Sequence, residues 1–241
     1  MIGPSGGGKT SLINTFVNNF CPTVYTPTED AVLYHRALQV SNPFDENQLV
    51  DALVEIEDTY AMDMSGKDSY KQSRDIKQFY DVSFTKDAVA SHHPFDNLEY
   101  QPRRNTYSAM TRVRMGYMFV FDASDIESFK AAVQAVKDFM TATPRDREHI
   151  IYLVANKCDK NTLGNPSIQT LYQEEKGKMP LHKKVNMKLW EVSALEFRRV
   201  RKLFLDMVDD IMLTPSLYLT REEVAAYSKP ILIEPDNCSL Q

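Results

Sequence analysis

Eight residues near the start of the chain have the types and spacing needed to hold phosphate. Residues 3–10 read Gly-Pro-Ser-Gly-Gly-Gly-Lys-Thr, the pattern of a phosphate-binding loop. In such a loop the backbone N–H groups surround the β-phosphate, the Lys reaches the β- and γ-phosphates, and the Thr hydroxyl takes Mg²⁺. The pattern predicts that a nucleotide is bound by Gly3, Ser5, Gly6, Gly7, Gly8, Lys9 and Thr10.

A second motif selects among nucleotides. Residues 156–159 read Asn-Lys-Cys-Asp and directly follow the apolar run 150–155. A carboxylate at Asp159 can accept two hydrogen bonds from the N1–H and the exocyclic NH₂ of guanine, whereas adenine has no matching donor pair. Discrimination built on buried hydrogen bonds can reach roughly 10⁴ or more. The two motifs together therefore predict a guanine nucleotide.

The elements that must position these residues are only partly present. A phosphate-binding loop connects a buried strand to a helix, and the helix is expected over residues 11–20. Only Met1 and Ile2 precede the loop, so the first strand is expected to be largely missing. Met1 is therefore not necessarily the true start of the protein. One hypothesis is that the start codon is wrongly placed or that the gene has decayed.

Apolar runs and helical patterns alternate along the rest of the chain. Strands are expected at 31–40, 49–56, 115–121 and 150–155, with a turn beginning at Ser41-Asn42-Pro43, and helices at 125–140 and 197–212. Alternating strands and helices favour an α/β fold with a mainly parallel central sheet flanked by helices. The domain is expected to cover residues 1–213, interrupted by a polar insertion at 60–104, and a tail follows at 214–241.

Composition excludes several classes of protein. The 241 residues carry a formal net charge of −5, which gives no electrostatic footprint for nucleic acid. No run approaches the ~20 apolar residues of a membrane-spanning helix, and no signal peptide is recognisable. Cys21, Cys158 and Cys238 are too widely spaced to suggest a disulfide framework or a metal site, so a reduced environment fits best.

The order of these motifs resembles that of the Ras-like small GTPases, and the fold implied is that of a P-loop NTPase. Residues 25–30 (Tyr-Thr-Pro-Thr-Glu-Asp) are similar to the first switch, and residues 53–59 to the strand that delivers the magnesium-associated Asp. Residues 107–110 resemble the second-switch helix, and residues 191–194 (Glu-Val-Ser-Ala) complete the set after the guanine motif.

The resemblance implies a role for each matching residue. Mg²⁺ would be held by Thr10, Thr28 and Asp58, and Lys9 and Thr28 would act on the γ-phosphate. The nucleotide would also contact Ser11, Phe20, which would flank the guanine, and Tyr25. Guanine would be selected by Asn156, Lys157 and Asp159, together with Ser193 and the backbone N–H of Ala194. The implied activity is a GTP/GDP switch in signal transduction.

The chain departs from the family at the second switch. The family reads Asp-x-x-Gly-Gln, but residues 58–62 read Asp-Thr-Tyr-Ala-Met, without the Gly or the water-orienting Gln. An alternative frame, Asp63 to Gly66, begins five residues later. We therefore expect slow GTP hydrolysis, and the alternative is a pseudo-GTPase: a membrane-tethered, nucleotide-binding interaction module without turnover.

The last four residues, Cys238-Ser239-Leu240-Gln241, fit a C-a-a-X prenylation motif in which Gln favours farnesyl. Lipidation at Cys238 implies peripheral attachment to the cytoplasmic face of a membrane, either the plasma membrane or an endomembrane, and the resemblance implies a monomer. The resemblance also implies the partners of a switch: effectors, a guanine-nucleotide exchange factor and a GTPase-activating protein.

Overall fold

The computed structural model describes residues 1–28, 32–42, 45–59, 114–142, 149–160, 167–179 and 185–218. The expected insertion at 60–104, the expected second-switch helix at 107–110 and the C-a-a-X residues all lie outside these ranges. So do the alternative frame at Asp63 and most of the expected tail.

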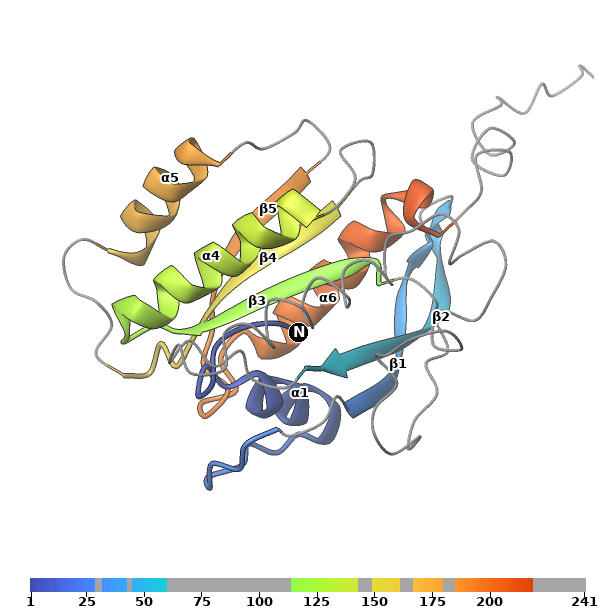
Figure 1. Ribbon diagram of the computed structural model, residues 1–241. Helices are drawn as coiled ribbons and strands as arrows, with labels where there is room; N and C mark the ends of the chain where they lie inside the picture. Colours follow the sequence, from blue (N-terminus) through green and yellow to red (C-terminus); the bar gives the residue numbers. More distant parts are fainter. Residues whose placement is uncertain are drawn as a thin grey trace, which may run out of the picture.

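A three-stranded parallel sheet forms the centre of the molecule. Its strands are β3 (Gly116–Asp122), β4 (His149–Asn156) and β5 (Val185–Glu191), in the order β3-β4-β5. The β3 and β4 sequences are continuous apolar runs because parallel strands are buried on both faces. Together with its flanking helices, this sheet confirms the expected α/β fold class (Figure 1).

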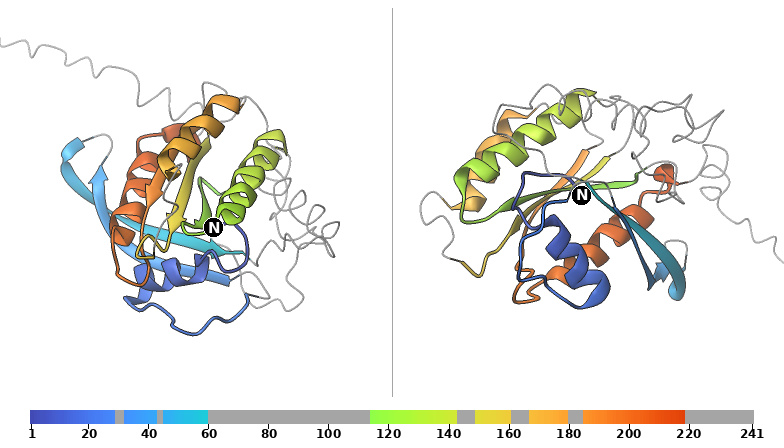
Figure 2. Two further views of the ribbon diagram at one scale, coloured as in Figure 1. Left: turned by 90° about the vertical axis from the view of Figure 1, so that its left-hand side faces the viewer. Right: turned by 60° about the horizontal axis from the view of Figure 1, so that its bottom comes forward.

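Alternate residues of β3 and β4 supply two separate cores, one on each face of the sheet. Phe119 and Leu153 point into a core with α4 (Ile126–Ala142) and α5 (Ile168–Lys178). Val120 and Val154 point into a core with α1 (Lys9–Asn18) and α6 (Val200–Met212). The two helical layers lie on opposite sides of the sheet in the turned views (Figure 2).

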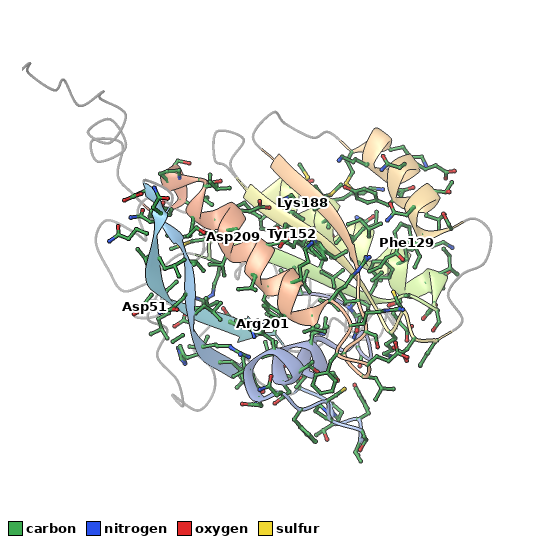
Figure 3. All side chains as sticks on the ribbon, turned by 180° about the vertical axis from the view of Figure 1, so that it is seen from behind. Asp51, Phe129, Tyr152, Lys188, Arg201 and Asp209 are labelled. Atoms are coloured by element: carbon green, nitrogen blue, oxygen red, sulfur yellow. The ribbon has the colours of Figure 1, made fainter. Side chains whose placement is uncertain are left out.

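Helix α6 is fixed to the sheet by polar contacts as well as by its apolar face. The Tyr152 hydroxyl donates to Asp210 Oδ2 at 2.6 Å, and Lys188 Nζ donates to Asp210 Oδ1 at 2.7 Å. Tyr152 and Lys188 lie beside this helix in the view from behind (Figure 3). Burial and the neighbouring Asp210 raise the pKa of Tyr152 well above its usual range, so this hydroxyl keeps its proton and acts as a donor.

A long antiparallel hairpin lies beside the sheet. Its strands are β1 (Val32–Asn42) and β2 (Asp45–Asp58), paired from Val32↔Asp58 to Asn42↔Asp45. Both strands are longer than the expected 31–40 and 49–56. The expected turn start is wrong, because Ser41 and Asn42 belong to β1 and pair across the hairpin.

Two residues connect the hairpin to the parallel sheet. Ile2 forms an isolated parallel bridge with Phe119, and its N–H donates to Met118 O at 2.8 Å. On the other side, the Met1 amino group donates to Glu57 O at 2.5 Å and the Thr59 hydroxyl donates to Met1 O at 2.7 Å. The sequence predicts that the first strand is largely missing, and in the structure Ile2 forms only this isolated bridge in its place.

Helices α1 and α6 differ from the sequence expectation at one end, whereas α4 agrees with it. Helix α1 ends at Asn18 because Asn19 adopts a left-handed conformation, which leaves Phe20 beyond the helix. Helix α6 starts at Val200 rather than at residue 197, since Phe197 and Arg199 have φ values of 57° and 59°. Helix α4 covers 126–142 and agrees closely with the expected 125–140.

The pattern analysis did not predict α5, β5 or the short 3₁₀ helix η1 (Pro215–Leu217), which follows α6. Within the described part of the chain, no helix is both long and apolar enough to cross a lipid bilayer.

Candidate functional site

The phosphate-binding loop leaves the Ile2 bridge and enters α1 within a few residues. Gly3 approaches β3 so closely that a Cβ there would lie 2.1 Å from Val120 O. Gly8 has a φ of 88° and serves as the N-cap of α1, and a Cβ there would lie 2.2 Å from Asn156 Nδ2. Glycine is therefore required at both positions, and the loop leads directly into the N-terminus of α1, where backbone N–H groups favour anions.

Lys9 lies inside this loop rather than on the surface. Its side chain is buried, and Nζ donates to Gly3 O at 2.9 Å and to Pro4 O at 3.3 Å. Burial lowers the pKa of Lys9 to about 8, although the nearby Asp58 carboxylate opposes the shift. A cation held by two carbonyl oxygens at a helix N-terminus is well placed to meet phosphate.

Three oxygen-bearing side chains from distant segments converge at the start of α1. Thr10 Oγ1 donates to Asp58 Oδ2 at 2.5 Å and lies 3.0 Å from Thr28 Oγ1. Asp58 is 1 % exposed, and its Oδ1 has no hydrogen-bond partner among the described residues. Burial raises the pKa of Asp58, against the hydrogen bond from Thr10 and the charge of Lys9.

This donor set fits Mg²⁺. Hard divalent cations take hydroxyl and carboxylate oxygens, and the buried Asp58 carboxylate carries an oxygen that a cation or its water shell would satisfy. The described ranges contain no group of three or more His, Cys, Asp or Glu side chains that could hold a metal ion, and this site consists of two hydroxyls and one carboxylate. Thr10, Thr28 and Asp58 are the three residues that the resemblance assigns to Mg²⁺.

The guanine-recognition motif lies against the phosphate-binding loop. Asn156 is 1 % exposed, donates from Nδ2 to Gly7 O at 3.1 Å, and accepts at Oδ1 from Ala194 N–H at 3.1 Å. One buried amide thus joins the loop expected at the phosphates to the segment expected at the base.

Asp159 and Ser193 complete the base end of the site. The Ser193 hydroxyl donates to Asp159 Oδ1, which fixes the carboxylate. Thr15 Oγ1 donates to Ala194 O at 3.2 Å, so α1 also supports this segment. Glu196 N–H donates to Ser193 Oγ at 3.1 Å and fixes the hydroxyl in turn.

Lys157 is oriented by a residue that the motif analysis missed. Its backbone has a φ of 64°, and its Nζ donates to Asp122 Oδ2 at 2.7 Å. Burial would raise the pKa of Asp122, but hydrogen bonds from Lys157 and Ser124 outweigh it and hold the pKa below its ordinary value. The sequence did contain a signal for Asp122. This residue follows an apolar strand, and the carboxyl ends of neighbouring parallel strands lie side by side, so Asp122 could have been expected near the guanine motif.

The remaining predicted residues lie around this site or outside the described ranges. The Ser5 hydroxyl is hydrogen-bonded to the Tyr25 hydroxyl, which connects the loop to the expected first switch. Phe20 and Tyr25 are 58 % and 62 % exposed, and Ser11 lies in the first turn of α1. Cys238 lies outside the described residues.

The fold and the loop define the class of the protein. It is an α/β protein whose P-loop lies at the carboxyl ends of the strands of a parallel sheet. A family model, Ras family, matches residues 99–213, slightly less than half of the chain. This match supports a Ras-like small GTPase, the family that the motifs resemble. A comparison with curated proteins finds no match.

The matched range includes β3, α4, β4, α5, β5 and α6, and with them the guanine motif. The phosphate-binding loop, Thr28 and Asp58 precede it, so their assignment depends on the geometry described above. Ras-like GTPases in general bind GTP or GDP with Mg²⁺, which agrees with the two groups of side chains at this site.

Proposed function

We propose that this chain is a GTP/GDP-binding molecular switch in signal transduction that uses Mg²⁺. The observation that supports the proposal most directly is the Asn156 bridge between Gly7 O and Ala194 N–H. It joins the phosphate-binding loop to the segment that includes Ser193, whose hydroxyl donates to the Asp159 carboxylate. A nucleotide would contact the loop and this carboxylate at once.

Each group has a distinct role in this proposal. Lys9 and the loop N–H groups neutralise phosphate charge, and Thr10, Thr28 and Asp58 hold Mg²⁺. Asp159 accepts hydrogen bonds from the guanine edge while Ser193 keeps it in place. A γ-phosphate would draw the Thr28 segment toward Mg²⁺, and GDP would release it, which is the change that effectors recognise.

Nucleotide competition tests the assignment. Purified protein loaded with fluorescent GDP is challenged with unlabelled GTP, GDP or ATP in the presence of Mg²⁺. GTP and GDP should displace the probe at concentrations at least about 10³-fold lower than ATP, because adenine leaves the Asp159 carboxylate unsatisfied. Equal competition by ATP would remove the guanine assignment.

Turnover is proposed to be slow. In-line attack needs a positioned water and donors aimed at the transferring oxygens, and Ala61 and Met62 stand where the family has Gly and Gln. The intrinsic rate should therefore fall below the family's roughly 10⁻⁴ per second. Lys9 and Thr28 remain available to stabilise the γ-phosphate.

Single-turnover hydrolysis distinguishes the slow GTPase from a pseudo-GTPase. The parent is compared with an Ala61→Gly/Met62→Gln double variant and with Gln101→Ala. Gln101 is the nearest glutamine upstream of residues 107–110. A slow parent that the double variant accelerates supports the proposal. A parent without turnover favours the pseudo-GTPase, and a parent at the usual rate that the double variant does not improve contradicts this interpretation of the switch.

Membrane attachment through a farnesyl group on Cys238 is a further part of the proposal, supported by the C-a-a-X residues alone. The chain would act as a peripheral monomer on the cytoplasmic face of a membrane. Its partners would be effectors, an exchange factor and a GTPase-activating protein.

A further inference from the structure

A positively charged surface lies at the start of α6, on the opposite side of the sheet from α4 and α5. Residues 195–202 read Leu-Glu-Phe-Arg-Arg-Val-Arg-Lys, and all of them except Val200 are exposed. They carry four cations and one carboxylate, Glu196. Leu195 directly follows Ala194 and belongs to the base end of the nucleotide site. The remaining exposed side chains form what we call the cationic patch: Phe197, Arg198, Arg199, Arg201 and Lys202.

The charges of α6 are placed against the preference of a helix. A helix N-terminus carries partial positive charge and a C-terminus partial negative charge, so acidic residues stabilise the first turn and basic residues the last. Helix α6 has no acidic residue in its first turn and no basic residue in its last turn. Arg201 and Asp209 lie toward opposite ends of the helix in the view from behind (Figure 3). Helix stability therefore does not explain this arrangement, which favours an anionic partner at the start of α6.

The patch begins in a tight turn that presents Phe197 to solvent. The Phe197 N–H donates to Ala194 O at 3.3 Å, and Ser193 and Arg198 form an antiparallel bridge on either side of the turn. Phe197 and Arg199 have left-handed backbone conformations, with φ values of 57° and 59°, which residues other than glycine rarely adopt. Phe197 is 49 % exposed in this turn. An aromatic ring on a projecting turn beside cations fits a soft surface that the ring can enter.

The cations of the patch are available to a partner. The side chains of Arg199, Arg201 and Lys202 form no hydrogen bond or ion pair with another residue of the described ranges. Arg198 donates to Cys158 O at 2.7 Å, and this carbonyl is neutral, so the charge of Arg198 is not cancelled. Four basic side chains close together on an exposed helix start are typical of segments that bind anionic lipid.

We propose that the cationic patch docks on the anionic surface of a lipid bilayer, with Phe197 entering the interface. Each basic residue near such a surface raises the binding constant by on the order of fivefold. The later half of α6 carries Asp206, Asp209 and Asp210, so the contact is limited to the first half of the helix. The patch alone would bind weakly and reversibly, as the second signal that a single prenyl chain needs. The proposal does not depend on the nucleotide assignment or on the lipid at Cys238.

Vesicle co-sedimentation of the full-length chain tests the proposal. Cys238→Ser serves as the background so that no lipid is attached, and phosphatidylcholine vesicles with and without phosphatidylserine are compared. The background protein should bind the phosphatidylserine vesicles at least roughly tenfold more tightly, and added salt should weaken this binding because exposed charges are screened. Equal binding to both kinds of vesicle, or binding to neither, would overturn the proposal.

A pair of double variants assigns the binding to the patch. Arg201→Gln/Lys202→Gln should lower the binding constant for phosphatidylserine vesicles by roughly 25-fold, because two fivefold contributions are lost. The matched control, Lys130→Gln/Lys178→Gln, removes the same charge from exposed positions on α4 and α5. The control should retain nearly all of the binding. Equal losses in the two variants would assign the effect to net charge and would contradict docking through the patch.

Phe197→Asn tests the aromatic contribution. Asn visits the left-handed conformation more readily than most residues, so the turn is retained. Binding should weaken by roughly fivefold at both low and physiological salt, since the contribution of buried apolar surface is not screened. An unchanged binding constant would show that Phe197 does not enter the interface.

Two further measurements separate this proposal from its alternatives. Affinity for fluorescent GDP should be unchanged in every variant, because residues 197, 201 and 202 lie outside the nucleotide site. The nucleotide assignment and the membrane proposal can therefore fail independently. Binding of the background protein to a soluble oligoglutamate but not to phosphatidylserine vesicles would assign the patch to an acidic protein and would overturn docking on lipid.

Discussion

Asn156 shows what a single residue contributes to this molecule. Both polar ends of its buried amide are used, one by Gly7 O and the other by Ala194 N–H. An apolar replacement would leave a buried carbonyl and a buried N–H without partners, at a cost of about 1–3 kcal/mol each. The residue therefore holds the two halves of the site together before any ligand arrives.

Asp159→Asn should exchange the base preference from guanine to xanthine. The amide oxygen can still accept from the Ser193 hydroxyl, so the local geometry is retained. The amide nitrogen now donates where the carboxylate accepted, and xanthine offers an oxygen at the position of the guanine NH₂. GTP affinity should fall by roughly 10² or more while XTP affinity rises, as measured by competition. Asp138→Asn on α4 is the matched control, and a loss of both affinities would indicate damage to the fold instead.

The pH dependence of nucleotide binding should follow Lys9. Its pKa of about 8 means that the ammonium form predominates well below that pH and is lost progressively above it. Phosphate favours the ammonium form, so affinity should be constant near pH 7 and should fall by up to about tenfold per pH unit above 8. Titrations between pH 7 and 8.5, where guanine largely retains its N1 proton, measure the effect.

Lys9→Arg supplies the control for that titration. Arginine remains protonated throughout, so any affinity that the variant retains should be flat across the same range. A parallel fall in both proteins would assign the titration to another group.

At the scale of elements, periodicity predicted the strands and helices that have a strong apolar signal. β3, β4 and α4 follow their apolar runs within a few residues. Helix α5 was missed because only Ile168 and Tyr172 of its residues are buried, and a mostly polar helix at the surface has no strong pattern. β5 did carry a signal, because Val-Asn-Met-Lys-Leu-Trp-Glu alternates apolar and polar residues as an edge strand does, but it lacks the continuous apolar run that marks β3 and β4.

The site residues also fall into two groups, those that a local motif predicts and those that only the folded structure brings together. The phosphate-binding loop and the guanine motif are short and local, so their residues could be named from the sequence. The contacts of Asp122 with Lys157 and of Thr15 with Ala194 join segments far apart in the chain. Only the folded arrangement reveals such pairs, because no local pattern specifies which distant side chain will be the partner.

The close contact between the loop and β3 predicts a severe effect of Gly3→Ala. The new Cβ would lie 2.1 Å from Val120 O, at a backbone φ of 148°, so backbone must move. The free energy of unfolding should fall by more than about 2 kcal/mol, measured by thermal or denaturant unfolding.

Gly177→Ala in α5 is the matched control, because a Cβ there meets nothing within 4 Å. Alanine in a helix should raise stability by roughly 0.5–1 kcal/mol. An equal and small effect at both positions would contradict the structural argument for Gly3.

At the scale of the whole molecule, the predicted lipid on Cys238 decides where the protein is found in its own cells. Cys238→Ser should move it from the membrane fraction to the soluble fraction, and an inhibitor of farnesylation should do the same. One prenyl chain binds a membrane only weakly, so the parent should distribute between both fractions. A soluble parent with a free Cys238 thiol and an intact tail would contradict the prediction.

A buried ionic cluster joins the two ends of the long segment between β2 and β3. Arg114 donates to Glu55 Oε1 at 2.6 Å and to Glu57 Oε2 at 2.7 Å, and the surrounding carboxylates raise its pKa against the effect of burial. The chain therefore leaves β2 and re-enters at β3 at neighbouring points. Closing a loop costs entropy that grows only with the logarithm of its length, so each doubling adds about 0.6 kcal/mol. The entropic cost of closing the connection between Thr59 and Arg114 therefore depends only weakly on the number of residues in it.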